Sequence, residues 1–455
     1  MTATLPLARW LDTHRPDETP LAWLSDRTWT LGEMRYDVAQ LYAQLQAHPG
    51  ERWALCFENS YLFIVALLAT LHAGKTPVIP GHSRVSLLQE QQALFDGVLS
   101  DKLLDHDGSM LLVSCANAKN EAKGPAALPP IADDAFVELF TSGSTGQPRR
   151  VRKPVTCLDS EAQMLAARFA DRLAGCRVVA SVVPQHLYGL TFRIVLPMAL
   201  SLPFHAAMLY YAEQLCVLPK DSRYVFISSP AFLKRLDCQL AAPPLAMILS
   251  AGGMLPWRDV EQTRAWAGVT PDEIYGSTET GILAWRYRVK DDMPWRPFPG
   301  VSFCAQEEAW RAFSPLIPQK EGLLLDDNLE FIEEDRFRLA GRRGRVVKIE
   351  EKRISLCEIE NRLLALEGIR EAAALPVTRK GRQGIGVLLV LDKPMLERWR
   401  QREGKQLELF WRRSLLPWLE PVAVPRYWRV IDEMPVNSMN KRVYAQLEEL
   451  FHETS

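Results

Sequence analysis

The segment from Phe140 to Lys153 has the composition of a phosphate-binding loop. It reads Phe-Thr-Ser-Gly-Ser-Thr-Gly-Gln-Pro-Arg-Arg-Val-Arg-Lys and follows an apolar, strand-like stretch, Ala135 to Phe140. Glycine adopts positive φ without strain, so successive backbone N–H groups can turn toward an anion, while hydroxyls and a guanidinium add donors and charge. The residues that would bind in this way are Thr141, Ser142, Gly143, Ser144, Thr145, Gly146 and Arg149. We therefore predict a site for a triphosphate, with an ordinary surface loop as the alternative.

This segment is not the common phosphate loop of nucleotide hydrolases. That motif requires a glycine, four residues of any type, and then Gly-Lys followed by Ser or Thr. The fifth residue after Gly143 is Pro148, so the spacing does not fit. A different nucleotide chemistry is implied.

Two further segments carry the same kinds of residues. One is Tyr275-Gly276-Ser277-Thr278-Glu279-Thr280-Gly281, and the other is Pro435-Val436-Asn437-Ser438-Met439-Asn440-Lys441. In order and spacing the three segments resemble the adenylate-forming superfamily, which includes acyl-CoA synthetases, firefly luciferase and the adenylation domains of peptide synthetases. The resemblance covers nearly the whole chain. It implies an α/β fold, with a large N-terminal AMP-binding body over residues 1–340 and a small, mobile α+β domain over residues 341–455.

The resemblance assigns roles in binding ATP and magnesium. Residues 141–146 would hold the β- and γ-phosphates, Thr278 would reach the α-phosphate, and Glu279 would bind Mg²⁺, a cation that prefers carboxylate and phosphate oxygens. Tyr275 would lie against the adenine ring, although a buried core aromatic residue is the alternative. The neighbours that complete this nucleotide site are Gly252, Gly253, Gly276 and Ser277.

Three residues in the second half of the chain complete the catalytic site that the resemblance implies. Asp327 would accept hydrogen bonds from the ribose hydroxyls, but the Thr-Gly that usually precedes this aspartate is absent, so a turn aspartate is the alternative. Arg342 would contact the ribose or the phosphates. Lys441 would bridge the carboxylate and the α-phosphate in the transition state, whereas a lysine near a C-terminus is otherwise usually solvated.

The chain departs from the family pattern at several positions. Arg149 and Arg150 replace the usual Lys-Gly of the first loop, Gly344 stands at the hinge in place of Asp or Lys, and Asn440 replaces a glycine. The stretch between Glu279 and Asp327 is also short for the family. These changes leave the turn of the first loop and the behaviour of the hinge open.

The segment Pro184-Gln185-His186-Leu187-Tyr188-Gly189-Leu190 corresponds to one wall of the family's acyl pocket. Peptide-synthetase domains carry an aspartate there for the substrate ammonium, and residues 184–193 contain none. An α-amino acid is therefore disfavoured, because a buried ammonium without a counter-ion is costly. His186, Tyr188, Ala251 and Gly252 suit a flat aromatic acid such as a hydroxybenzoate. A fatty acid would also fit, and His186 has the alternative of a buried structural histidine.

The resemblance implies an AMP-forming acid–thiol ligase that uses ATP and Mg²⁺. The chain looks most like short ligases that charge an acid onto the phosphopantetheine of an acyl carrier protein in aryl-polyene or type II fatty-acid-like systems. Residues 341–455 hold 22 Lys and Arg against 16 Asp and Glu, which would suit an acidic carrier or coenzyme A unless this distribution is chance. An acyl-CoA synthetase using free coenzyme A, an adenylate user that makes no thioester, and a degenerate nucleotide-binding regulator are the alternatives.

Hydrophobic periodicity predicts the elements that would position these residues. Strands over 53–57 and 76–79 flank a helix over 61–72, which is a βαβ unit. Farther along, a helix is expected over 161–174 and strands over 177–183, 224–228 and 245–250. After a basic joint at 341–344, the expected elements are a strand over 346–349, a helix whose start has Ser355 and Glu358 in a capping box, strands over 369–376 and 385–391, and a helix over 405–416.

The composition agrees with a globular enzyme and excludes little else. The 455 residues include 54 basic and 55 acidic side chains, a balance that points to neither nucleic acid nor a membrane surface as partner. Eight scattered cysteines without a Cys-x-x-Cys pair fit free thiols in the cytoplasm. The apolar stretches 61–71 and 194–212 are too short or too interrupted for a transmembrane segment, so we expect buried helices there.

Overall fold

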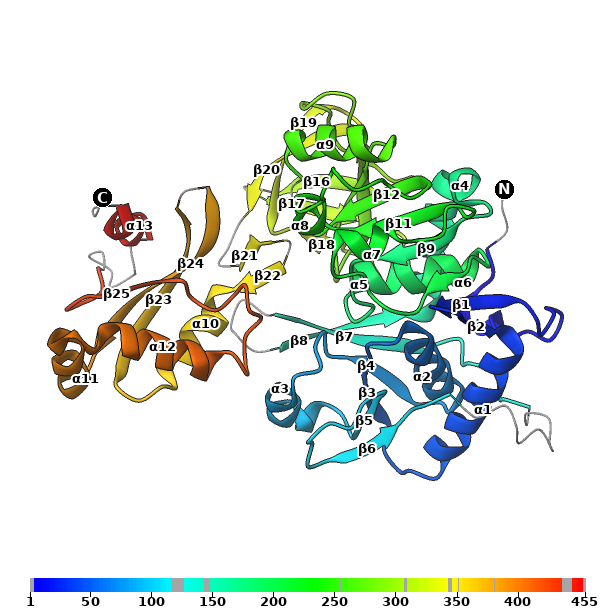
Figure 1. Cartoon of the computed structure of the whole chain (residues 1–455), viewed down its shortest axis with the longest axis horizontal. Helices are drawn as coiled ribbons and strands as arrows, with labels where there is room; N and C mark the ends of the chain where they lie inside the picture. The colour runs from blue at the N-terminus through cyan, green and yellow to red at the C-terminus, as the bar shows by residue number, and fades with distance from the viewer. Residues whose placement is uncertain are drawn as a thin grey trace. The chain divides into compact units, whose positions relative to one another are not determined.

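The computed structural model describes residues 4–115, 127–142, 148–253, 255–306, 309–342, 346–350, 352–379, 381–435 and 444–452. The chain forms two compact units (Figure 1). The first comprises Met1–Ser83, Leu88–Thr141 and Arg150–Arg343, and the second comprises Arg84–Leu87, Ser142–Arg149 and Gly344–Ser455. The functional division at residue 340, and the mobility expected of the part after it, stay predictions.

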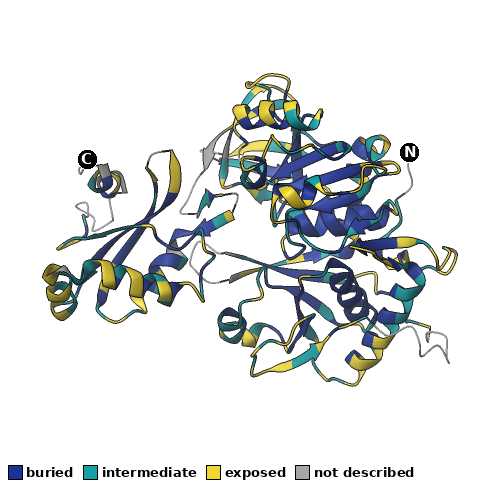
Figure 2. Cartoon of the chain, viewed as in Figure 1, coloured by how far each residue is buried: buried dark blue, intermediate teal, exposed yellow. Residues whose placement is uncertain are grey.

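One sheet of the first unit has six strands in the order β6-β5-β3-β4-β7-β8. Its strands are β3 Arg52–Cys56, β4 Thr76–Ile79, β5 Gly97–Ser100, β6 Ser109–Leu112, β7 Phe136–Ser142 and β8 Pro148–Pro154. β3 and β4 run parallel and are joined through α2 (Ser60–His72), so the predicted βαβ unit is confirmed. Every residue of α2 is buried, which explains why its sequence is apolar on all sides (Figure 2).

The other large sheet of this unit has nine strands in the order β15-β14-β13-β12-β11-β9-β10-β1-β2. Its strands are β1 Pro20–Leu24, β2 Arg27–Thr30, β9 Arg177–Ala180, β10 Phe204–His205, β11 Tyr224–Ser228, β12 Leu245–Ala251, β13 Asp272–Ser277, β14 Gly281–Tyr287 and β15 Arg296–Pro297. The strands from β1 to β13 through β10, β9, β11 and β12 are parallel neighbours. Their carboxyl ends therefore share one edge, where α/β sheets usually bind ligands.

Several expected boundaries were wrong: the strand expected over 177–183 ends at Ala180, the strands expected over 369–376 and 385–391 are each three residues longer, and two other elements differ more. Helix α4 runs over Val155–Leu173, so it begins six residues earlier than the periodicity predicted, directly after Pro154. The apolar stretch 194–212 is helical only at its start, as a π-helix over Leu190–Val195 and α6 over Leu196–Ala199. Beyond it, Phe204 pairs with both β1 and β9, because Pro203 cannot continue a helix.

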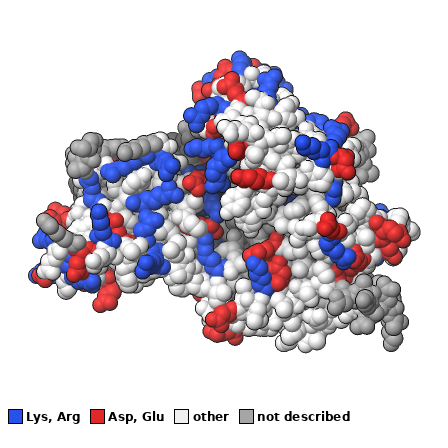
Figure 3. Space-filling model, in the orientation of Figure 1, with Lys and Arg blue, Asp and Glu red and all other residues white. Residues whose placement is uncertain are grey.

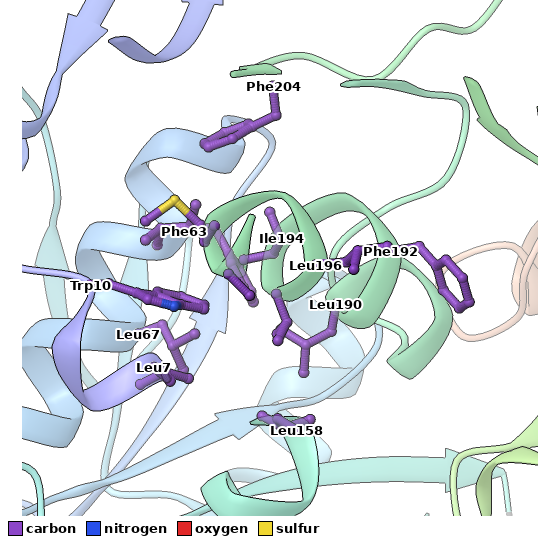
Figure 4. Packing of buried hydrophobic residues seen from close by; sticks show 14 of the residues in the cluster. Leu7, Trp10, Phe63, Leu67, Leu158, Leu190, Phe192, Ile194, Leu196 and Phe204 are labelled. Carbon is purple, nitrogen blue, oxygen red and sulfur yellow. The ribbon is translucent and has the colours of Figure 1, made fainter. Parts of the chain in front are cut away.

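The main hydrophobic core joins both large sheets. It takes in side chains of β3, β9, α2 and α4, with the π-helix and α6 among them. Figure 4 shows Leu190, Ile194 and Leu196 on this helical segment, with Trp10 and Leu67 packed beside it. Among the helices of the described residues, none is long and apolar enough to cross a membrane.

The rest of the first unit consists of further helices and small sheets. The helices are η1 Leu7–Arg9, α1 Leu31–Gln46, α3 Val85–Glu90 (Arg84–Leu87 clusters with the second unit), η2 Gln92–Leu94, α5 Leu187–Gly189, α7 Ala212–Cys216, α8 Pro230–Leu233 and α9 Trp257–Ala267. The strands are β16 Ser302–Gln306, β17 Ala309–Phe313, β18 Leu323–Leu324, β19 Asp327–Glu333 and β20 Arg336–Arg342. β19 and β20 form an antiparallel pair that packs an aromatic cluster against Tyr275.

The second unit is a small α+β structure. Its elements are β21 Val346–Ile349, β22 Lys352–Ser355, α10 Leu356–Leu364, β23 Ile369–Arg379, β24 Arg382–Leu391, α11 Lys393–Arg398, the π-helix Trp399–Glu403, α12 Gly404–Leu415, β25 Tyr427–Val430 and α13 Tyr444–His452. One half of the predicted capping box of α10 is confirmed, because the Ser355 hydroxyl accepts the Glu358 N–H. β24 lies between antiparallel β23 and parallel β25. Trp411, which is fully buried, stacks on Trp399 and Trp428.

Candidate functional site

The predicted nucleotide residues gather at the carboxyl ends of β12 and β13. Ala251 is the last residue of β12 and pairs with Ile274 of β13, so Tyr275 follows one position later on the neighbouring strand. Gly252 comes next after Ala251 and has φ +91°, a conformation that favours glycine, which is why this strand end can turn away sharply. Gly253 follows it and is half-buried.

Tyr275 and Asp327 form a hydrogen-bonded pair. The Tyr275 hydroxyl donates to Oδ2 of Asp327 over 3.0 Å. Its ring is 7% exposed and packs against Trp295 and Phe337, so the two readings of Tyr275, core aromatic and site residue, are compatible. Asp327 begins strand β19 and pairs with Arg342 of β20, so a turn aspartate is the wrong description. A carboxylate has four lone-pair positions, so it can accept more than one hydrogen bond.

Thr141 and Glu279 connect the first and second predicted motifs. The Thr141 hydroxyl donates to Oε1 of Glu279 at 3.3 Å, although 138 residues separate them. A carboxylate and a hydroxyl are oxygen ligands of the kind that Mg²⁺ prefers, and a nucleotide-bound Mg²⁺ needs few protein ligands because phosphates and water supply the rest. Within the described residues no group of three or more His, Cys, Asp or Glu could hold a metal alone. Glu279 and Thr141 therefore fit a magnesium ion that arrives with its nucleotide.

The turn that carries Thr278 and Glu279 is fixed by its own side chains. Ser277 and Thr280 exchange hydrogen bonds, since the Ser277 N–H donates to the Thr280 hydroxyl at 3.0 Å and the Thr280 N–H donates to the Ser277 hydroxyl at 3.2 Å. At Gly276, a Cβ atom would lie 2.2 Å from the carbonyl oxygen of Gly281, so only glycine allows the two strands to close this tightly. Thr278 and Glu279 thus stand at the end of a rigid hairpin.

The other predicted loop residues are placed only in part. Ser142 ends β7, while Arg149 and Arg150 lie in β8, so the chain continues as a strand where the family usually has Lys-Gly. Gly143, Ser144, Thr145 and Gly146 lie outside the described residues, as do Gly344, Asn440 and Lys441. For Arg342 the structure gives the backbone position in β20.

The predicted wall of the acyl pocket contains one exposed and one anchored side chain. His186 is exposed at the start of α5, so the alternative of a buried structural histidine is wrong. A Cβ atom at Gly81 would lie 3.2 Å from Cε1 of His186, which places the imidazole beside the end of β4. The Tyr188 hydroxyl lies 3.0 Å from the Ser228 carbonyl oxygen and 3.1 Å from that of Leu249, and burial raises its pKa. The hydroxyl is therefore bound to the backbone, and the ring remains for apolar contact.

Directly behind the Glu279 turn lie two residues to which the sequence analysis assigned no function. Lys153 at the end of β8 and Glu161 in α4 are each 2% exposed. Burial lowers the pKa of Lys153 and raises the pKa of Glu161, while their mutual attraction opposes both shifts. The available signal was the position of Glu161 on the apolar stripe of α4, between Leu158 and Ala162.

Comparison with known proteins agrees with this geometry. Residues 7–309 match the family described as AMP-binding enzyme. This chain belongs to that family. The resemblance read from the three sequence segments is thereby confirmed.

Individual relatives of this AMP-binding enzyme are distant. It is 26% identical over 271 residues to a 4-coumarate–CoA ligase of Cereibacter sphaeroides, a match that takes in 56% of this chain and 60% of that ligase, which is less than two thirds of its length. Among solved structures, o-succinylbenzoate CoA synthetase of Bacillus subtilis has a TM-score of 0.80 at 18% identity, with 97% of this chain and 98% of that chain covered. A malonyl-CoA ligase has a TM-score of 0.78 at 19% identity, with 94% and 99% covered. The predicted α/β fold with a small second domain is confirmed.

Proposed function

We propose that the protein is an AMP-forming ligase that joins a carboxylic acid to a thiol at the expense of ATP. The observation that carries the proposal is the contact between Thr141 and Glu279, because it unites the phosphate-loop strand with the second motif. The pair of Tyr275 and Asp327 adds a nucleoside-binding element on the same hairpin strand. A site that bound phosphate alone would need neither the contact between Thr141 and Glu279 nor the pair of Tyr275 and Asp327.

In the first half-reaction an oxygen of the substrate carboxylate attacks the α-phosphorus of ATP, and pyrophosphate leaves. Both reactants are anions, so the protein must neutralise charge and align them. Mg²⁺, when bound through Glu279, supplies positive charge to the phosphates. Thr278 orients the α-phosphate, residues 141–146 and Arg149 bind the β- and γ-phosphates, and Lys441 stabilises the charge that develops between carboxylate and phosphate.

In the second half-reaction the thiol loses its proton and its sulfur attacks the acyl carbon. The bond between that carbon and the bridging oxygen breaks, so AMP leaves and a thioester forms. Asp327, Tyr275 and Arg342 keep AMP in place during this step. Gly344 allows the second unit to change its orientation between the two half-reactions.

We propose an aryl acid such as a hydroxybenzoate as the substrate, with a fatty acid as the alternative. The proposed wall lacks an acidic residue over 184–193, which disfavours an ammonium-bearing acid. The bound hydroxyl of Tyr188 leaves an apolar ring surface, while exposed His186 adds a polar group that can meet a phenolic hydroxyl. Ala251 and Gly252 have a methyl group and no side chain, respectively, which leaves space for a flat ring.

For the thiol we propose the phosphopantetheine of an acyl carrier protein. This choice is supported by the charge of the second unit, because residues 341–455 contain more Lys and Arg than Asp and Glu. Figure 3 shows Lys and Arg side chains on the face of this unit that is turned toward the viewer. Carrier proteins are acidic, so docking on such a face would accelerate association at low salt. Free coenzyme A is the second candidate, because relatives of this chain are named as CoA ligases.

The test is acid-dependent exchange of pyrophosphate into ATP over a panel of aryl and fatty acids, followed by thioester formation with carrier protein or coenzyme A. We expect exchange with at least one acid and transfer to the carrier that weakens as salt shortens the Debye length from about 10 Å to about 3 Å. Nucleotide binding without exchange for any acid would instead support a regulatory protein. Equal use of coenzyme A without salt dependence would reject the carrier.

A further inference from the structure

Two buried charges of opposite sign lie behind the turn that carries Thr278 and Glu279. Lys153 is the second-last residue of β8, and Glu161 lies two turns into α4, which begins right after that strand. Both side chains are 2% exposed. Buried lysine and glutamate are rare and require partners, so their contacts indicate what they do.

Lys153 binds main-chain oxygens of two segments that are distant in sequence. Its Nζ donates to the carbonyl oxygen of Glu279 at 3.2 Å and lies 3.5 Å from the carbonyl oxygen of Leu316. The first contact fixes the peptide immediately after the residue proposed to bind magnesium. The Glu279 side chain itself accepts the Thr141 hydroxyl, so the lysine contacts the peptide while the carboxylate meets the phosphate-loop strand.

Glu161 holds the other end of the same turn. Its Oε1 accepts the N–H of Ile282 at 2.8 Å, and its Oε2 accepts the hydroxyl of Thr191 at 2.7 Å. Gly281, between Glu279 and Ile282, has φ +70°, and a Cβ atom there would lie 2.9 Å from Oε1 of Glu161. The positive φ and the close approach of the carboxylate together favour glycine at this position.

Stability alone is a weak reason for this arrangement. Replacing a buried pair of charges by apolar side chains of similar volume is often neutral or stabilising. A fixed turn geometry is a better reason, because catalytic groups must be held within fractions of an ångström and depend on supporting contacts. The two contacts at Glu279 and Ile282 bracket the turn from both sides.

We propose that Lys153 and Glu161 are positioning residues that hold the Glu279 turn in the geometry that binds magnesium-loaded ATP. They touch neither the nucleotide nor the metal and act through the backbone of residues 279–282. The inference rests on the proposed function, since it assigns the turn to Mg²⁺ and ATP. It adds two residues that no sequence motif of the site contains.

The test compares ATP binding to the full-length protein, by calorimetry, with and without Mg²⁺. For Lys153→Met we expect Kd for ATP in the presence of Mg²⁺ to rise at least tenfold, with much less change when Mg²⁺ is left out, because small displacements of site groups have effects of this size. In pyrophosphate exchange the KM for ATP should rise while the KM for the acid is retained. If Lys153 had a purely structural role, its substitution would not change the KM for ATP while leaving the KM for the acid unchanged.

Two further variants keep the test decisive. The double variant Lys153→Met with Glu161→Gln removes both charges, so it stays interpretable if the single lysine change leaves Glu161 unpaired and prevents folding. Arg288→Met is the matched control, because Arg288 is a buried cation bound to Glu273 at the far end of the same β13–β14 hairpin. We expect the double variant to lose affinity for ATP with Mg²⁺ and the folded control to keep it.

The outcomes separate this inference from the proposed function. A double variant that is folded and binds ATP with Mg²⁺ as the wild type does would overturn the positioning role and leave the proposed function standing. An equal loss of affinity in Arg288→Met would also overturn it, because any buried charge of the hairpin would then suffice. Wild-type protein that binds no ATP would overturn both.

Discussion

The hydroxyl of Tyr275 donates a hydrogen bond to Oδ2 of Asp327 across 52 residues of sequence. The two residues belong to different sheets, β13 of the nine-stranded sheet and β19 of a two-stranded one. Their contact fixes the carboxylate beside an aromatic ring, an arrangement that suits a nucleoside, whose base stacks and whose ribose hydroxyls donate.

Tyr275→Phe tests this pair. The ring and its packing remain, but Asp327 loses one donor that orients it, so we expect ATP affinity to fall by about 1 kcal/mol, which is roughly fivefold. Calorimetric titration with ATP and with inorganic pyrophosphate provides the measurement and its control. Loss of pyrophosphate binding to the same degree would show that the tyrosine acts on the whole site and not on the nucleoside.

Glu279→Gln tests the magnesium ligand. The substitution keeps the size of the side chain and removes its charge, so ATP binding should become weak and almost independent of Mg²⁺ while the thermal unfolding temperature is retained. Titration of Mg²⁺ at fixed ATP gives the dependence directly. If the variant responds to Mg²⁺ as the wild type does, the assignment of Glu279 is wrong.

Gly281→Ala and Gly175→Ala form a matched pair, because both glycines have φ +70°. At Gly175 nothing lies within 4 Å of an added Cβ, so only the backbone strain of about 1–2 kcal/mol is expected. At Gly281 the added atom would meet Oε1 of Glu161 and Cδ1 of Leu316, each at 2.9 Å, which should cost about 1–3 kcal/mol more and weaken binding of magnesium-loaded ATP. Denaturant unfolding measures both, and equal destabilisation would contradict the close packing of Glu161 and Leu316 against Gly281.

Buried His72 and half-buried His205 predict how stability depends on pH. Burial is the main cause that lowers the pKa of His72 and of His205 from the usual 6.5. Their rings donate to the carbonyl oxygens of Pro129 and Ala207, respectively. The unfolded chain thus binds more protons than the native protein just below pH 6.5, so stability is present above this pH and is lost as the pH falls through it.

The double variant His72→Gln with His205→Gln should flatten this dependence. Each histidine contributes a slope of at most about 1.4 kcal/mol per pH unit, and the difference between wild type and variant isolates them from the carboxylates. Urea unfolding between pH 7.5 and pH 5.5 measures the slopes. Identical slopes would mean that neither imidazole is kept neutral by the fold.

Several strands of the fold could be predicted because each is a short apolar run bounded by turn-forming or polar residues. The strands 76–79, 224–228 and 346–349 have the bounds expected from the sequence. The start of α4 was missed because Lys-Pro-Val before it reads as a strand end, and the helix there begins without a side-chain cap. A local sequence pattern therefore predicts that a helix or strand exists better than it predicts the residues at which that element begins and ends.

The contacts within the site could not be predicted because they depend on tertiary structure. Nothing near Tyr275 in the sequence indicates that its hydroxyl meets Asp327, and nothing near Lys153 indicates a carbonyl oxygen 126 residues away. The motifs named the residues that would face ATP. For Lys153 and Glu161 the sequence offers only the place of Glu161 on the apolar stripe of α4, and their contacts with the Glu279 turn come from the tertiary structure.

The most direct measurement of the central claim is phosphorus NMR of the protein with ATP, Mg²⁺, an accepted acid and a thiol acceptor. We expect AMP and pyrophosphate to appear in equal amounts and only when the acid is present, with thioester formed in the same amount. Formation of ADP and phosphate, or ATP cleavage that does not depend on the acid, would contradict the central claim.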